Sequence, residues 1–165
     1  VLFRSGASLM SMVIVLFLTL NSFADFTYTT NDVYYKNKIL AAQIKVNDTI
    51  KSQCFKDFIM KRSRLEQTNG KTREQVIEDI RSQSITIQVN TYRKNNGVIG
   101  FRQPPSKDIN INKKFHDQYF ACSSAANLAH ESSHVVGYTH DFKLTKRRPF
   151  SVPYSISSAF SICCK

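Results

Sequence analysis

Hydrophobic side chains recur with helical spacing in two segments of the first half of the chain. Residues 47–64 place their apolar groups on one face, which predicts a helix capped by Asn47 or Asp48. Thr72 followed by Gln75 has the pattern of a capping box, which predicts a second, short helix. The apolar residues behind these predictions are Ile50, Cys54, Phe55, Phe58 and Ile59 in the first helix and Val76, Ile77 and Ile80 in the second.

From residue 84 onward the pattern changes to the alternation of apolar and polar groups that is typical of half-buried strands. Residues 84–92 alternate in this way, and the Asn95-Asn96-Gly97 turn predicts a hairpin with residues 98–102 as the partner strand. Residues 108–112 are predicted to form one more short strand. Residues 26–36 are rich in Thr, Tyr and Phe and suit a strand near the start.

Two further helices complete the predicted order of elements. Ser123 or Ser124 is expected to cap a third helix, and the segment from Pro153 to Cys163 can form a last short one. The order is then a strand, helices, several strands, a helix, an irregular segment and a helix. This order indicates an α+β fold in which a small mixed sheet packs on helices.

The N-terminal segment has the features of a secretory signal peptide. Residues 9–20 form an uncharged, mostly apolar run that is too short to span a bilayer comfortably. Arg4 precedes this run, and Ser22-Phe23-Ala24 offers small residues at a cleavage site. We therefore expect residues 1–24 to be a signal peptide and residues 25–165 to form one domain.

The signal-peptide interpretation has an alternative, a buried core helix, and it bears on where translation starts. Val1 is not a normal first residue, so Met10 or Met12 could be the true start, with residues 1–9 non-native. A cleaved signal peptide implies a secreted or periplasmic protein with no stable membrane span in the mature chain.

All four cysteines follow the predicted cleavage site, and an even number after a signal peptide suggests disulfides. Neighbouring cysteines rarely bond each other, because such a bridge strains the peptide between them. We therefore expect Cys163 and Cys164 to bond Cys54 and Cys122, in either pairing. A zinc site built from thiols is disfavoured because the spacing shows no CxxC pair.

The chain is strongly basic, with a formal net charge of +11. One cluster of positive residues comprises Lys143, Lys146, Arg147 and Arg148. The charge favours attraction to an acidic surface or polymer, such as cell-wall polymer, nucleic acid or anionic lipid, and the other interpretation is a solvated basic face. No nucleic-acid-binding motif accompanies the charge, so no specific nucleic-acid partner is expected.

Residues 128–142, LAHESSHVVGYTHDF, carry the pattern that points to chemistry. His130 and His134 are four residues apart, so on a helix their rings project from the same face and can hold a zinc ion together. Glu131 lies one step round the helix, where it can take a proton from a water molecule on the open side of the metal.

A third ligand is available only if the helix ends soon after His134. His140 lies six residues farther on, which on a continuous helix is roughly 600° of rotation and would turn its ring away from the metal. Gly137 can end the helix, because glycine adopts the left-handed conformation without strain. Three histidines leave a fourth coordination position for water, which is typical of a catalytic zinc site.

The pattern His130-Glu131-x-x-His134-x-x-Gly137-x-x-His140 resembles the signature of the metzincin zinc metalloproteases at every fixed position. The chain also resembles a group of small secreted bacterial metallopeptidases from about residue 47 to its end. The resemblance implies a zincin-like catalytic domain with an active-site helix and with Zn²⁺ as its cofactor.

The chain departs from that family after the third histidine. Metzincins have a methionine-containing turn below the zinc, whereas no Met follows Met60 here. Val152 and Pro153 fall where that turn would be and could supply its apolar floor. The resemblance to astacin-like enzymes implies that Tyr154 donates a hydrogen bond to the developing oxyanion, and the alternative is a core tyrosine.

Two further polar residues have simpler interpretations. We expect His116 to be a surface or loop histidine. Asp141, which extends the motif as in the adamalysin and reprolysin-like branch, is expected either to accept a hydrogen bond from the backbone or a ligand histidine, or to close the turn.

Three functions fit this sequence. The first is a zinc-dependent endopeptidase with Glu131 as general base, in which the hairpin from Ile85 to Arg102 offers an edge strand to a peptide or protein substrate. The second is a secreted basic zinc-binding protein. The presence of a base beside an open metal site argues against this function. The third is a zinc hydrolase that acts on cell-wall peptide amides, with which the basic charge agrees.

Overall fold

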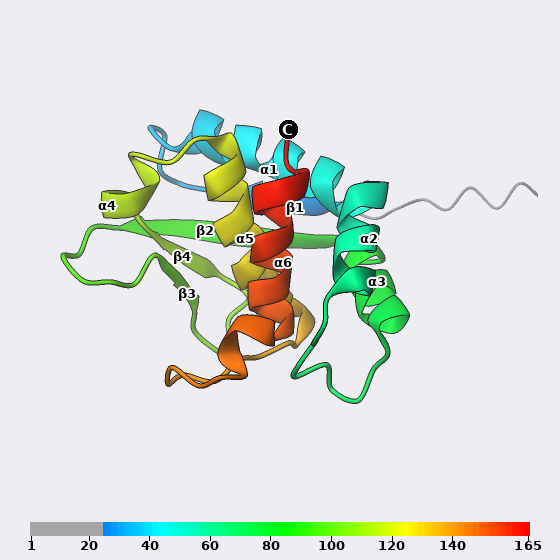
Figure 1. The fold of residues 1–165 in the computed structure, drawn as a ribbon. Helices are drawn as coiled ribbons and strands as arrows, with labels where there is room; N and C mark the ends of the chain where they lie inside the picture. Colours follow the sequence, from blue (N-terminus) through cyan, green and yellow to red (C-terminus); the bar gives the residue numbers. More distant parts are fainter. Residues whose placement is uncertain (1–24) are drawn as a thin grey trace, which may run out of the picture.

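Alternating apolar residues build the centre of the fold, a four-stranded mixed sheet (Figure 1). The computed structural model describes residues 25–165, and the proposed signal peptide lies outside the described residues. The strand order is β1-β2-β4-β3, in which β2 is parallel to both neighbours and β3 is antiparallel to β4. The strands are β1 (Phe26–Thr29), β2 (Ile85–Tyr92), β3 (Gly100–Arg102) and β4 (Ile109–Asn112).

Helices connect and follow these strands in the order that the hydrophobic pattern predicts, with the short helix α4 as an addition. The α+β class is therefore confirmed for the described residues. The helices are α1 (Lys36–Lys51), α2 (Gln53–Lys61), α3 (Arg73–Arg81), α4 (Lys113–His116), α5 (Ala121–Val136) and α6 (Val152–Cys163), with a short 3-10 helix η1 (Arg148–Phe150) before α6.

Helix α5 is the central support of the fold. It packs against α1, α6 and the strands β3 and β4, and Figure 1 shows α5 and α6 side by side. Leu128 of α5 is fully buried together with Ile109 and Ile111 of β4, and Ile156 of α6 closes the same core. The functional motif thus begins in a helix whose position is set by the hydrophobic core.

The predicted hairpin between residues 84–92 and 98–102 is wrong, because β4 lies between β2 and β3. The side chain of Asn112, fully buried at the end of β4, accounts for the difference. Its amide donates to the carbonyls of Lys94 and Val98 and accepts from the Lys94 N–H. These hydrogen bonds satisfy backbone groups of a wide loop between β2 and β3. The loop leads the chain to the far side of β4, whereas a tight turn would place β3 next to β2.

The long helix predicted over residues 47–64 is in fact two helices that meet at Ser52. Helix α1 begins much earlier, and the Ser52 hydroxyl caps α2 by accepting the Phe55 N–H. Asn47 is not a cap, since its side chain bonds both backbone groups of Phe26 and so holds the outer edge of β1. A polar side chain that pairs with a strand edge cannot be distinguished from a cap by its position in the sequence.

Some of the other predicted helix boundaries agree with the structure and some do not. The Thr72 and Gln75 capping box is confirmed in both directions, and the last helix is confirmed as α6. The cap at Ser123 or Ser124 is wrong, because α5 starts after Phe120 and Ser124 is buried inside it. The strand expected over residues 26–36 is paired only over β1.

Two disulfides join the C-terminal end of the chain to two helices. Cys54 of α2 bonds Cys163, and Cys122 of α5 bonds Cys164, which confirms the expected partners and settles the pairing. The neighbouring cysteines therefore clamp the end of α6 between α2 and α5. No helix among residues 25–165 is long and apolar enough to cross a membrane.

We expect each disulfide to stabilise the protein by roughly 2–4 kcal/mol, because each closes a long loop in the unfolded chain. Replacing Cys54 and Cys163 by serine should cost at least as much as replacing Cys122 and Cys164, since the bridged residues are 109 and 42 positions apart. Urea unfolding of the two variants, with reduced protein as the reference, measures both. Four free thiols in the purified, unreduced protein would contradict this prediction.

Candidate metal centre

The motif helix α5 ends at Gly137, as the sequence predicts. Gly137 has a φ of 109°, in the left-handed region. The N–H of Gly137 bonds the His134 carbonyl, and that of Tyr138 bonds the Ser133 carbonyl, so the last turn of the helix is closed. The chain then reverses over the helix end, and the buried Tyr138 ring anchors the return.

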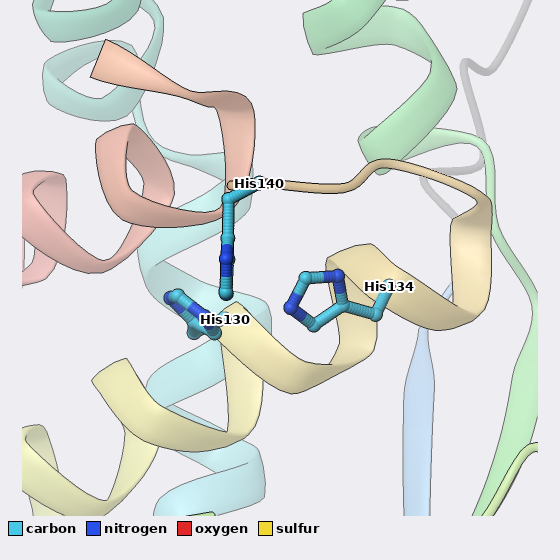
Figure 2. Close-up of side chains that lie close together, drawn as sticks. All are labelled: His130, His134 and His140. Atoms are coloured by element: carbon cyan, nitrogen blue, oxygen red, sulfur yellow. The ribbon is translucent and has the colours of Figure 1, made fainter. Parts of the chain in front are cut away.

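This reversal brings His140 to the two histidines of the helix. Figure 2 shows the three rings pointing toward one another, His130 and His134 from α5 and His140 from the segment after it. One nitrogen of each ring lies within 4.8 Å of the others. The three predicted ligands therefore form a group that could hold a metal ion.

Hydrogen bonds within the protein orient these rings. The Nδ1 of His134 donates to the Tyr138 carbonyl at 2.7 Å, and the Nδ1 of His140 donates to the Asp141 carbonyl at 3.1 Å. The backbone of Pro153 bonds His130. When one ring nitrogen carries the proton and donates in this way, the other ring nitrogen keeps a free lone pair. This neutral tautomer is the form of histidine that binds a metal.

The rings are also kept neutral. Burial and the neighbouring histidines lower the pKa of His130 to about 3, and burial lowers the pKa of His134 and His140. A metal ion competes with protons for imidazole nitrogen, so neutral rings at physiological pH suit a metal site.

Glu131 lies beside the three rings and is almost fully buried, with 4% of its surface exposed. Burial raises the pKa of Glu131 to about 7, and a hydrogen bond from the backbone of Arg102 partly offsets this effect. A carboxyl group with a pKa near neutrality both takes and releases protons easily, which is what a general base requires.

Arg102 ties strand β3 to the metal-binding end of α5. Its backbone bonds Glu131, and its Nη1 donates to the His134 carbonyl at 3.2 Å. The same guanidinium donates to the carbonyls of Ser106 and Pro105. Arg102 therefore sets the distance between the buried carboxylate and the strand, a role that no sequence pattern indicated.

The rings and Glu131 open into a cleft of about 880 Å³. Strand β3 and the loop before it form one wall, and the exposed sides of α5 and α6 form another. A cleft of this size is large enough for a segment of peptide or another extended ligand.

Tyr154 lies at the first turn of α6 and in the wall of the cleft. Its ring centroid is 4.8 Å from that of His130 and 5.0 Å from that of His140. Val152 and Pro153 are buried directly before it.

The segment after the third histidine is braced by the loop that contains Gln67 and Asn69. Asp141 accepts from Gln67 and Thr145 through its carboxylate and does not bond a ligand ring with it, so its side chain closes the turn. Asn69 donates to the Gly137 carbonyl. Gln67 and Asn69 both have positive φ values, and their sequence neighbourhood gives no sign of this contact with the site.

His116 is not a surface histidine, because only 1% of it is exposed. Its Nε2 donates to the Asn127 side chain of α5 at 2.9 Å, and burial lowers its pKa. Asn127 in turn lies under Gly100, where an added Cβ would come within 2.7 Å of its oxygen. His116 is thus part of the packing between α4, α5 and β3, outside the metal-binding group.

No known family model, curated protein or solved structure matches this chain. The resemblance to metzincins therefore stays a prediction that the eleven-residue motif carries.

We expect Gly137→Ala to lower the free energy of unfolding by about 1–2 kcal/mol and to weaken metal binding. An added Cβ meets no atom within 4 Å, so the cost comes from the left-handed backbone alone. Gly97→Ala is the matched control, since that glycine also has open space but no positive φ. Equal stability and metal affinity in the two variants would contradict the role of Gly137.

The protein should bind one metal ion per chain through the three rings. Elemental analysis of the purified protein should give one equivalent, which His134→Ala loses because two rings bind far more weakly than three. His116→Gln, at a histidine outside the group, should keep the metal. Full metal content in His134→Ala would rule out this ligand set.

Proposed function

We propose that the protein is an exported zinc-dependent endopeptidase. The observation that carries the proposal is a buried carboxylate, Glu131, beside three convergent imidazoles at the floor of an open cleft. A purely structural metal site needs neither the base nor the cleft. The two disulfides agree with an oxidising, extracellular location.

Zinc is the metal that the donor set favours, because neutral imidazoles suit it and three of them leave a coordination position open. His130, His134 and His140 would hold the ion. When bound, zinc acts as a Lewis acid that makes water more acidic and polarises a substrate carbonyl.

Glu131 performs the proton transfers of the proposed reaction. One of its carboxylate oxygens accepts a proton from the attacking water and later delivers it to the leaving nitrogen of the cleaved amide. The backbone of Arg102 keeps the carboxylate in place for both steps.

Strand β3 offers the edge on which an extended peptide could lie. Phe101 pairs with Asn110, and the Ile99 carbonyl accepts the Asn112 N–H, so both residues direct their backbone groups at β4. In an antiparallel pair the residue between them, Gly100, then directs its N–H and carbonyl outward into the cleft. The predicted edge strand is thus β3 alone and not a hairpin with β2.

Tyr154 supports the same proposal from the opposite wall. Its ring contacts two of the three imidazoles, and its hydroxyl makes no hydrogen bond with residues 25–165. The hydroxyl is therefore free to donate to the negative oxygen that develops on the cleaved carbonyl.

We expect Glu131→Gln to keep the fold and one zinc ion but to lower peptide hydrolysis by about 10²- to 10⁴-fold, because an amide cannot accept the proton. Cleavage of a quenched peptide library, with and without a chelator, measures this loss. Glu74→Gln, the same change at an exposed position of α3, is the control. Near-normal turnover in Glu131→Gln would exclude this mechanism. If the protein releases cell-wall fragments but cleaves no peptide of the library, the substrate is peptidoglycan instead of a protein.

A further inference from the structure

Arg148 places a cation in the wall of the cleft, one aromatic ring away from the metal-binding group. It is the first residue of η1, and it comes from the basic cluster that the sequence shows. Its guanidinium carbon lies 5.1 Å from the centre of the Tyr154 ring, whose other neighbours are His130 and His140. This cation–π contact holds the guanidinium against the ring at the cleft wall.

The hydrogen-bonding groups of Arg148 are mostly unused. Its Nη1 donates to the Phe142 carbonyl at 3.1 Å. Its Nε is buried and has no partner within the described residues. The Nη2 group makes no hydrogen bond within the described residues, and a charged N–H group of this kind binds a carboxylate oxygen strongly.

The charge of the cleft agrees with an anionic ligand. Glu131 is the only acidic residue that lines the cleft in the part of the chain that the structure describes. Arg102 also lines it, but its guanidinium is already bonded to three backbone carbonyls. Arg148 is therefore the cation that remains available to a ligand in the cleft.

We infer that Arg148 forms a carboxylate-binding subsite, so that preferred substrates carry a carboxylate next to the bond that is cleaved. The carboxylate comes either from an Asp or Glu side chain or from the C-terminus of the substrate. This inference rests on the proposed peptidase function, because only a peptidase would cleave the bound peptide. The carboxylate-binding subsite itself can be tested by binding alone.

The test compares matched peptides with the disulfide-bonded, zinc-loaded protein. Each pair differs only in Glu against Gln at one position, or in a free against an amidated C-terminus, which separates the two sources of carboxylate. We expect a carboxylate preference in kcat/KM of about 10- to 100-fold for the wild type, as for a hydrogen bond to a charged group. Arg148→Gln should reduce this preference to about one, and Arg148→Lys should restore part of it, because lysine keeps the charge without the fork.

Lys146→Gln is the matched control, since it removes the same charge from an exposed position of the same loop outside the cleft. It should leave the preference unchanged. If Arg148→Gln does not fold, the wild type is compared with Arg148→Lys instead. Equal carboxylate preferences in these two proteins would overturn the inference. A wild type without any carboxylate preference overturns it as well.

Equilibrium binding to zinc-loaded Glu131→Gln separates this inference from the proposed function. Arg148-dependent binding of the carboxylate peptides to Glu131→Gln, together with a zinc-loaded wild type that cleaves none of them, supports the subsite and refutes the peptidase. Cleavage with no dependence on Arg148 supports the peptidase and refutes the subsite. If none of the carboxylate peptides binds to Glu131→Gln, the subsite is refuted whatever the activity.

Discussion

The geometry of the site depends on where helix α5 ends. Three imidazoles can meet only if the chain leaves the helix within one turn of His134, and the left-handed Gly137 makes that exit. The reversed segment is then anchored by Tyr138, whose ring is buried and whose hydroxyl donates to Asp79 of α3. The Tyr138 carbonyl in turn orients His134, so a single residue fixes both the return of the chain and one of the ligands.

A second constraint acts from the C-terminus. Helix α6 carries Tyr154 at its start and the neighbouring Cys163 and Cys164 at its end. The start is held by Glu66, whose backbone bonds Phe150 and Val152, and the end is held by the disulfides to α2 and α5. The distance from the ligand rings to Tyr154 is therefore set at both ends of α6.

The sequence was a good guide to the site because the site is local. His130, Glu131, His134 and His140 lie within eleven residues, and one helix period with one glycine break decides where they point. The disulfide partners also followed from a local rule about neighbouring cysteines. The prediction that failed, the hairpin, concerns contacts between distant residues. The position of β4 between β2 and β3 depends on the buried Asn112 side chain, and the hydrophobic periodicity does not indicate which strands become neighbours.

The same limit explains why the two arginines of the cleft could not be told apart from the sequence. Arg102 lies in a strand and its guanidinium is saturated by backbone carbonyls, so it works as a brace between β3 and α5. Arg148 lies before α6 with its guanidinium over the Tyr154 ring, and within the described residues only its Nη1 has a side-chain hydrogen bond, to the Phe142 carbonyl. A guanidinium has five donors, and their use depends entirely on which carbonyls the fold brings near. Because the imidazoles are kept neutral, the positive charge that a ligand in the cleft meets comes from Arg148, from Arg102 and from any bound metal ion. Among the described residues that line the cleft, Glu131 is the one acidic group that opposes this charge.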